Sequence, residues 1–354
     1  MTQNADLEPA PEEAVTAGRH AAEVLPELAA RPPAADGAGA LPPRLADLEA
    51  KVAAAISRGR SAATLRAYRS DWADFTTWCA TVGLEALPAA PATVAGYVAE
   101  MASPPDDRSP AAVSTITRRL AAIGEGHKVA GHPNPCTEVV VRETMKGIRR
   151  ILGVAPRPKK AVATADVRAA VGPLGTSLLD TRDRLVLLLG FAGAMRRSEL
   201  VGLDVADVEE VDEGLLVHLG RSKTDQEGAG RRVEVVYGTE APTCPVRAWR
   251  AWLAASGITD GPVFRPVDRH GRLGERRLSA QAVAIVVKRH MAGLGYRSAD
   301  FAGHSLRRGH ATTAARNGAS ERTIMRTTGH TSTATVRAYV EDGELFSDPA
   351  SKYL

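Results

Sequence analysis

Apolar residues recur every three or four positions from Ser61 onward, the spacing that places side chains on one face of a helix. The clearest run consists of Leu65, Tyr68, Trp72, Phe75 and Cys79. Similar patterns predict further helices over 92–102, 111–129 and 137–152. The first folded body is therefore expected to be entirely helical and to end near Gly153.

The pattern changes in the second half of the chain, where strands join the helices. An apolar run over 180–191 predicts a buried helix, and alternation over 214–220 and 231–237 predicts two strands joined by a hairpin tip at 221–230. Further helices are expected over 245–255, 279–293, 305–317, 320–326 and 332–340. The predicted fold class is mainly α with a small β-sheet, in which an α+β body follows an all-helical one.

Shifts in composition divide the chain into five predicted parts. Residues 1–45 are acidic, rich in Pro and poor in large apolar residues, which predicts a disordered arm. A helical domain over 46–153 follows, then a linker over 154–163 that holds two prolines and three cations. This linker is either simply solvated or a basic strap along phosphates. A second domain is expected over 164–342, followed by a tail over 343–354.

The charge of the chain is unevenly distributed. Residues 1–50 carry nine acidic and three basic side chains, which gives them a net charge of −6. The whole chain has a net charge of +4, so the other 304 residues carry a net charge of +10. A basic body suits a polyanionic partner such as nucleic acid, although a soluble protein with a mildly basic surface has the same balance. The three cysteines are far apart, and neither a targeting signal nor an apolar run of membrane length appears. We therefore expect a cytoplasmic protein with no membrane partner.

Five short segments of the second domain combine cations with candidate nucleophiles. They are Gly193–Leu200, Arg221–Asp225, His304–Arg307, Gly329–Ser332 and Arg337–Tyr339. Tyr339 follows His330 by nine residues. Together, in this order, the segments resemble the signature of the tyrosine recombinases, the phage integrase family. The resemblance runs from about Ser61 to the C-terminus and implies a helical core-binding domain before a catalytic domain.

Direct attack on a phosphodiester places extra negative charge on phosphorus, so catalysis depends on positioning and on charge stabilisation. Two guanidiniums can each give paired donors to the non-bridging oxygens. The resemblance assigns this role to Arg196 and Arg307, although the adjacent Arg197 and Arg308 are also cations. It assigns the general acid for the leaving 5′-oxygen to Lys223, which is otherwise an ordinary lysine of a polar hairpin tip.

The remaining roles also follow from the resemblance. His304 would assist removal of the proton from the nucleophile, His330 would donate to a phosphate oxygen, and Glu199, on the same helical face as Arg196, would orient it. Buried structural histidines and a surface ion pair are the alternatives. Tyr339 would be the nucleophile because nearby cations favour its phenolate, although a core aromatic is the simpler interpretation. Tyr353 is a rival hydroxyl. The resemblance implies no metal and no cofactor.

The resemblance further implies that the two domains grip duplex DNA as a C-shaped clamp. Cations of the first domain that could contact phosphates, or could equally form a solvated helix face, are Arg60, Arg66, Arg69, Arg118, Arg119, Lys146, Arg149 and Arg150. The tail would dock on a neighbouring protomer, unless it is a frayed terminus.

The expected function is site-specific recombination by a homotetramer, through a 3′-phosphotyrosine intermediate and a Holliday junction, at the nucleoid and in the service of a mobile element. Accessory proteins that bend DNA or set the direction of the reaction are possible further partners. One alternative is a type IB topoisomerase, which relaxes DNA without a specific site. The other is a DNA-binding regulator on the same fold that has no catalytic activity.

Overall fold

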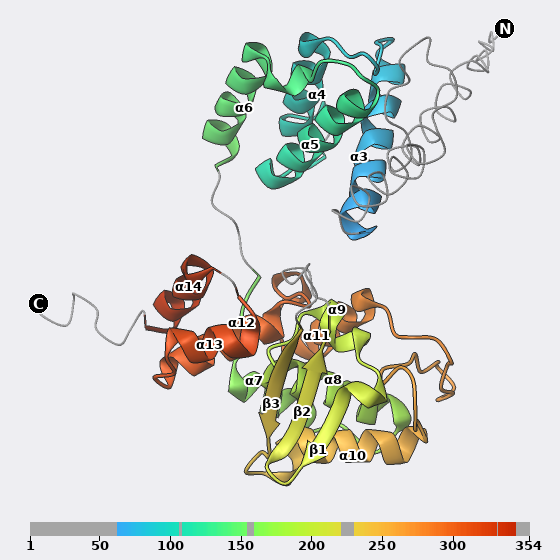
Figure 1. Cartoon of the computed structure of the whole chain (residues 1–354), viewed down its shortest axis with the longest axis vertical. Helices are drawn as coiled ribbons and strands as arrows, with labels where there is room; N and C mark the ends of the chain where they lie inside the picture. The colour runs from blue at the N-terminus through green and yellow to red at the C-terminus, as the bar shows by residue number, and fades with distance from the viewer. Residues whose placement is uncertain (1–61, 106–107, 154–158, 221–229, 331, 345–354) are drawn as a thin grey trace, which may run out of the picture. The chain divides into compact units, whose positions relative to one another are not determined.

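The computed structural model describes residues 62–105, 108–153, 159–220, 230–330 and 332–344 (Figure 1). Contacts within the chain form two compact units, Met1–Pro156 and Arg157–Leu354. The predicted arm over 1–45 and most of the tail lie outside the described residues, as do Arg60, Lys223 and Tyr353. Among the described helices, none combines the length and the apolarity that a membrane span requires.

The first unit is built from helices, as its periodicity predicts. They are α3 (Ala62–Thr81), α4 (Pro91–Ala102), α5 (Val113–Val129) and α6 (Val139–Leu152), with the short 3-10 helix η2 (Pro135–Thr137) before α6. Trp72, Phe75 and Cys79, three members of the stripe seen in the sequence, are buried in its core with Tyr97 and Ile123. The stripe therefore marks the face of α3 that packs inward.

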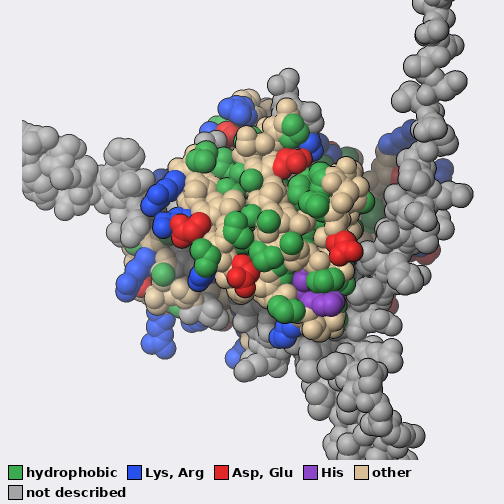
Figure 2. Space-filling model, turned by 90° about the horizontal axis from the view of Figure 1, so that it is seen from above, with side chains coloured by type: hydrophobic (Ala, Val, Ile, Leu, Met, Phe, Trp, Pro, Cys, Tyr) green, Lys and Arg blue, Asp and Glu red, His purple; other side chains and the backbone are tan. Residues whose placement is uncertain are grey.

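The surface of this unit mixes charged and apolar side chains. Figure 2 shows a face on which apolar side chains lie among a few acidic ones, while Lys and Arg gather toward one margin. Exposed large apolar residues of the unit include Val82, Leu84, Val139, Val140 and Ile151. Single exposed apolar residues are normal on soluble proteins.

The second unit contains an antiparallel sheet of three strands among helices, so the predicted fold class is confirmed. The strands are β1 (Val208–Val211), β2 (Gly214–Leu219) and β3 (Arg231–Val236), in that spatial order. The sequence did not predict β1. Its pairing with β2, which sets Val208 opposite Val217, places it at an edge of the sheet.

The helices of the second unit fall into an inner and an outer group. The inner group shares the main core with the sheet: α7 (Thr164–Val171), α8 (Leu178–Ala192), α9 (Arg197–Gly202), α10 (Pro245–Ser256) and α11 (Ala280–Gly293). The short 3-10 helices of this unit are η3 (Val205–Asp207), η4 (Ala241–Thr243) and η5 (Ser298–Asp300).

The outer group comprises α12 (Ser305–Arg316), α13 (Glu321–Thr328) and α14 (Thr333–Glu344). These helices share a smaller apolar cluster that includes Ala311, Ile324 and Val336. Helix α12 contacts both α8 and α14, so it links this cluster to the main core (Figure 1). Helix α12 also packs closely against the segment before α7: a Cβ at Gly309 would lie 1.9 Å from the carbonyl oxygen of Val162, so no larger residue fits at position 309.

Candidate active site

Arg196 and Glu199 lie at the start of α9 and hold each other in place. Arg196 is the residue just before the helix, and Glu199 is the third residue within it. The Glu199 carboxylate accepts the backbone N–H of Arg196 at 2.8 Å and the Arg196 Nη1 at 2.5 Å. A carboxylate in the first turn is favoured by the unpaired N–H groups there. The two residues therefore meet across the helix start, and not on one helical face as the sequence suggested.

The turn between α8 and α9 positions Arg307. Ala194 is buried and has a φ of 47°, a left-handed conformation that is unusual for a residue other than glycine. Its carbonyl accepts a hydrogen bond from Arg307 Nη1 at 2.9 Å. The strained turn thus presents a backbone acceptor that holds one side of the Arg307 guanidinium.

Arg307 is 2% exposed, and its Nη2 has no hydrogen-bond partner among the described residues. Burial and the positive charge of Arg196 lower its pKa to about 10, so it is still protonated at neutral pH. A buried guanidinium donor left without an acceptor is costly, and an anion with oxygen acceptors removes that cost. The geometry therefore indicates an anion site beside Arg307.

His330 follows the turn that ends α13. Its Nδ1 lies 2.8 Å from the Thr328 hydroxyl, which donates its own proton to the carbonyl of Ile324 at 2.6 Å. The hydroxyl has one proton, so it accepts from Nδ1–H and leaves Nε2 as the titrating nitrogen. Burial, followed by the charges of Arg307 and Arg196, lowers the pKa of His330 to about 4. In the free protein His330 is therefore neutral at pH 7.

His304 precedes α12 and is electrostatically coupled to the same group. Partial desolvation of its ring and the positive charge of Arg307 lower the pKa of His304. His304 in turn contributes to lowering the pKa of His330. Both histidines thus lie in the field of the same arginines, which opposes protonation of either ring until an anion enters.

Tyr339 lies on α14 at the edge of the outer apolar cluster and is half-buried. The centroids of its ring and the His330 ring are 5.6 Å apart, and the Arg308 guanidinium lies 5.9 Å from the centroid of the Tyr339 ring. The tyrosine therefore packs as a core aromatic does and also borders the cationic cluster. Arg308 contacts the ring of the tyrosine, whereas Arg307 lies in the buried group.

The structure thus brings together Arg196, Glu199, Arg307, His330 and Tyr339, with His304 coupled to them. Lys223 lies outside the described residues, on the segment between β2 and β3. Arg231 was not predicted from the sequence, and its Nη2 donates to Glu199 Oε2 at 2.8 Å. The only feature of the sequence that could have drawn attention to Arg231 is its position directly after the predicted hairpin tip at 221–230.

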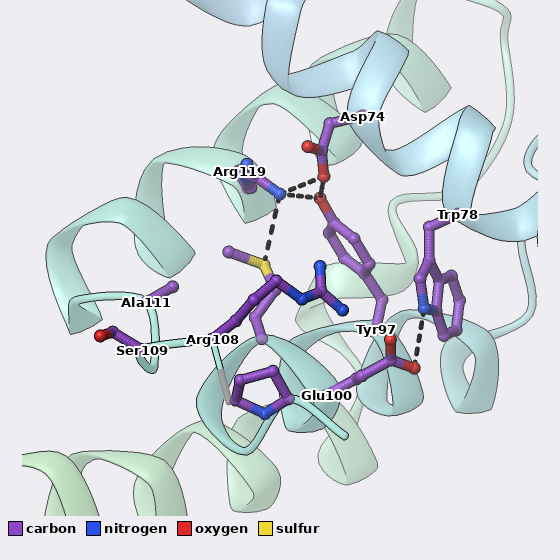
Figure 3. Close-up of a pocket in the computed structure, with 10 residues that line it drawn as sticks. Asp74, Trp78, Tyr97, Glu100, Arg108, Ser109, Ala111 and Arg119 are labelled. Carbon is purple, nitrogen blue, oxygen red and sulfur yellow. Dashed lines mark hydrogen bonds and ion pairs between the residues drawn. The ribbon is translucent and has the colours of Figure 1, made fainter. Parts of the chain in front are cut away.

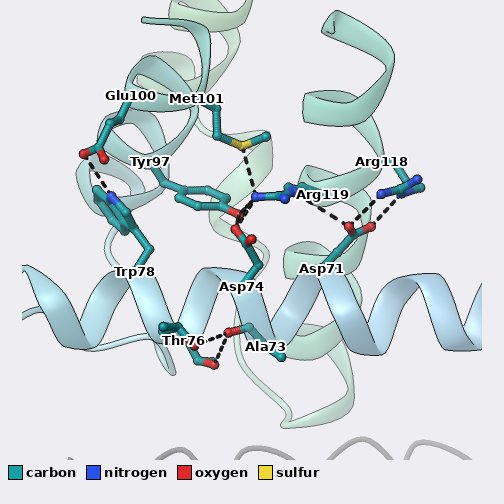
Figure 4. Close-up of polar contacts among 11 residues, drawn as sticks. Asp71, Ala73, Asp74, Thr76, Trp78, Tyr97, Glu100, Met101, Arg118 and Arg119 are labelled. Carbon is teal, nitrogen blue, oxygen red and sulfur yellow. Dashed lines mark hydrogen bonds and ion pairs between the residues drawn. The ribbon is translucent and has the colours of Figure 1, made fainter. Parts of the chain in front are cut away.

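Three of the eight cations proposed for DNA contact are paired inside the first unit, and one of them is Lys146, whose Nζ lies 3.2 Å from a Glu143 carboxylate oxygen. Arg118 donates to both carboxylate oxygens of Asp71, at 2.7 and 2.8 Å. Arg119 bonds Asp74 and the Tyr97 hydroxyl (Figure 4). Arg118 is 49% exposed despite its pairing, and the exposed cations of the set also include Arg66, Arg69, Lys146, Arg149 and Arg150.

A cavity of about 210 Å³ lies beside Arg119 and is lined in part by Trp78, Tyr97, Glu100 and Arg108 (Figure 3). The Trp78 indole N–H donates to Glu100 at 3.0 Å. Burial and the hydrogen bond to Asp74 raise the pKa of the Tyr97 phenol. Several polar groups that line the cavity are therefore bonded to one another: Trp78 to Glu100, and Tyr97 to Asp74.

The likeness to known proteins extends beyond the second unit. The model of the phage integrase family matches residues 164–344. The chain is also 38% identical over 307 residues to an integrase/recombinase described as a xerD homolog, from Selenomonas ruminantium, and the match covers 86% of this chain and 88% of that protein. This chain belongs to the phage integrase family. The family predicted from the five segments is thereby confirmed.

Two further likenesses agree with this assignment. The recombinase Cre of Escherichia phage P1 is 26% identical over 287 residues, which cover 76% of this chain and 80% of Cre. A crystal structure of the XerH site-specific recombinase in a post-cleavage complex has the same fold, with a TM-score of 0.59 at 14% identity over 85% of this chain and 83% of that one. As a tyrosine recombinase of the phage integrase family, the protein is an enzyme that breaks and rejoins DNA.

Proposed function

We propose that Tyr339 attacks a DNA phosphodiester and forms a 3′-phosphotyrosine bond. The observation that carries the proposal is the buried Arg307, whose Nη2 has no acceptor among the described residues, in the same cluster as Tyr339. A scissile phosphate would supply that acceptor. The bond between the phenolic oxygen and phosphorus forms as the bond between phosphorus and the 5′-oxygen breaks, so no high-energy cofactor is consumed.

Each neighbouring group has a proposed share in this step. Arg196 and Arg307 neutralise the non-bridging oxygens, where charge builds up in the transition state. His304 takes the phenolic proton, and Lys223 donates a proton to the departing 5′-oxygen. His330 donates to a phosphate oxygen, for which its Nε2 must first gain a proton. The negative phosphate favours that gain, because it opposes the cationic field that keeps His330 neutral in the free protein.

On this chemistry we propose site-specific recombination as the biological activity. The chain would act as a homotetramer on two duplex sites and would exchange one pair of strands and then the other through a Holliday junction. Its 38% identity to a described integrase/recombinase over most of its length supports this proposal. The enzyme would act in the cytoplasm, at the nucleoid, with accessory factors as further partners.

Duplex DNA would be held by both units, with a helical core-binding domain over 46–153 and a catalytic domain over 164–342. The exposed cations of the first unit would contact phosphates and set the position of the protein along the duplex. Residues 343–354 would dock on the neighbouring protomer.

The test begins by mapping where the protein becomes covalently attached to fragmented genomic DNA of its host. A nicked duplex built on the mapped site then traps the cleaved state, because the short leaving strand diffuses away. Wild type should form an adduct that survives SDS, and Tyr339→Phe should form none. If wild type forms no adduct, or Tyr339→Phe still does, the proposal is wrong.

A plasmid assay separates recombination from simple relaxation. Two copies of the mapped site on one plasmid should yield recombinant circles, and a plasmid without the site should stay supercoiled. Robust relaxation of the plasmid that lacks the site would instead support topoisomerase activity.

A further inference from the structure

Arg231 is the first residue of β3, and only Gly230 separates it from the segment 221–229. Its side chain is 17% exposed. Nη2 donates to Glu199 Oε2 at 2.8 Å, and Nη1 donates to the carbonyl oxygen of Thr327, in the last turn of α13. A single guanidinium thus joins three parts of the fold: the start of α9, the end of α13 and the base of the hairpin.

The turn after α13 is shaped around this guanidinium. Gly329 ends the helix with a φ of 63°, the left-handed conformation that favours glycine. A Cβ at this position would lie 2.7 Å from Arg231 Nε and 2.9 Å from its Cδ. The carbonyl of Gly329 also accepts Arg196 Nη2 at 3.3 Å. Arg231 and Arg196 therefore flank the same turn, the one that leads into His330.

The two arginines also share one carboxylate. Glu199 uses Oε1 for Arg196 Nη1, and Oε2 for both the Arg196 backbone N–H and Arg231 Nη2. Burial alone would raise the pKa of Glu199, but the charge of Arg231 and the contacts with Arg196 outweigh it and keep the carboxylate ionised. Removing Arg231 would leave Oε2 with a single donor in a site that is 5% exposed. Such a carboxylate would be free to rotate and would take Arg196 with it.

We propose that Arg231 is a positioning residue: it fixes the Glu199 carboxylate, which in turn aims the Arg196 guanidinium at the phosphate. The inference rests on the proposed cleavage function, because it concerns how that phosphate is bound. Both terminal nitrogens of Arg231 are committed, Nη2 to Glu199 and Nη1 to the Thr327 carbonyl, and the remaining Nε is buried, so the residue acts through Arg196 and not on the substrate.

The first experiment measures single-turnover cleavage of the mapped nicked duplex. Arg231→Met should slow adduct formation about 10- to 100-fold, the range in which a small misplacement of a reacting group acts. Arg231→Lys should restore little, because one ammonium cannot span both acceptors in the planar geometry of arginine. Arg232→Met, an exposed cation on the same strand, is the matched control and should stay within about twofold of wild type.

A double-mutant cycle tests the route through Glu199. If Arg231 acts by holding the carboxylate, Arg231→Met should add less than about threefold to the loss caused by Glu199→Gln, since residues that act as a unit are not additive. Independent, multiplying losses would overturn the inference.

A modified substrate separates positioning from misfolding. Replacing a non-bridging oxygen of the scissile phosphate by a methyl group removes the negative charge that Arg196 has to neutralise. On this methylphosphonate duplex, the Arg231→Met defect should shrink to within about threefold of wild type, as should that of Arg196→Met. A defect of equal size on both substrates would indicate general damage and would overturn the inference. If wild type itself forms no adduct, the proposed function fails; if wild type cleaves and Arg231→Met cleaves equally fast, only the inference fails.

Discussion

Each unit of the protein contains a cluster of arginines and carboxylates, and the two clusters differ in their charge balance. In the first unit Arg118 and Arg119 pair with Asp71 and Asp74, one cation for each carboxylate (Figure 4). Asp71 is buried, and Tyr97 completes the network. This cluster has no excess charge to attract an anion, although the buried Nε of Arg119 lacks a hydrogen-bond partner among the described residues. Its contacts hold α3, α4 and α5 together.

In the second unit Arg196 and Arg231 bond the carboxylate of Glu199, whereas the Arg307 guanidinium interacts with that carboxylate only electrostatically. Among the described residues of this cluster, the guanidiniums exceed the carboxylates by two, and the Nη2 of Arg307 lacks an acceptor. A protein that buries uncompensated cations in this way is prepared for an anion. The comparison shows that the count of arginines in a sequence says little about phosphate binding until their carboxylate partners are known.

The largest expected effect comes from removing the arginine that lacks an acceptor. Arg307→Met should reduce single-turnover cleavage by about 10²–10³-fold, the usual cost of losing one donor to a developing anion. Arg118→Met, from the balanced cluster, is the matched control, and its cleavage per bound complex should stay close to wild type. Equal losses in the two variants would remove the distinction between the clusters.

The reverse pattern is expected for stability. Asp71 is 3% exposed, and Asp71→Asn removes the charge with which its buried carboxylate accepts the two hydrogen bonds of Arg118, so the free energy of unfolding should fall by about 1–3 kcal/mol. Arg307→Met should not destabilise the protein in this way, because it removes a buried charge that lacks a full set of partners. Urea titrations of the full-length variants measure both. A more stable Asp71→Asn would contradict the structural role of the first cluster.

The next largest effect is expected in the pH dependence of stability, because the cationic cluster lowers the pKa of His330. His330 has a pKa of about 4 in the folded protein, below the value of about 6.5 for an unperturbed histidine, so the unfolded chain binds more protons between these values. His330 therefore destabilises the fold progressively as the pH falls from about 6.5 to 4. In His330→Gln the slope of unfolding free energy against pH should be shallower by up to about 1.4 kcal/mol per pH unit. An unchanged slope would show that the cluster does not act on His330.

The smallest expected effect concerns DNA affinity. The logarithm of the binding constant for duplex DNA should fall linearly with the logarithm of salt concentration, because bound phosphates release counterions. Arg149→Gln, which changes an exposed cation, should reduce this slope by about 0.9. Arg118→Gln should change the slope less, because that side chain, although 49% exposed, is held by two hydrogen bonds to Asp71. Identical slopes in the two variants would mean that pairing within the first unit does not decide which cations reach DNA.

The elements of the fold were largely predictable because periodicity records which face of each element is buried. The stripe on α3 ends in the core, and β2 and β3 alternate as expected. Strand β1 was missed because Val208 and Val211 are its only apolar residues and neither is fully buried. A half-exposed edge strand leaves little apolar signal in a sequence.

Residues of the candidate site could be predicted only where they belong to a recognisable sequence motif. Arg196, Arg307 and Tyr339 stand in segments that can be recognised in sequence, whereas Arg231 meets Glu199 across 32 residues of chain and Thr327 across 96. The pairing of Arg118 likewise depends on Asp71, 47 residues away. Such contacts arise from tertiary packing, and local pattern contains no trace of them.

The most direct test of the central claim is to identify the residue that carries the DNA. The trapped wild-type adduct is digested with nuclease and trypsin, and the peptide that retains a nucleotide is sequenced by mass spectrometry. The account predicts the peptide Ala338–Lys352, with the phosphate on Tyr339. A nucleotide on Tyr353, or on any peptide of the first unit, would contradict it.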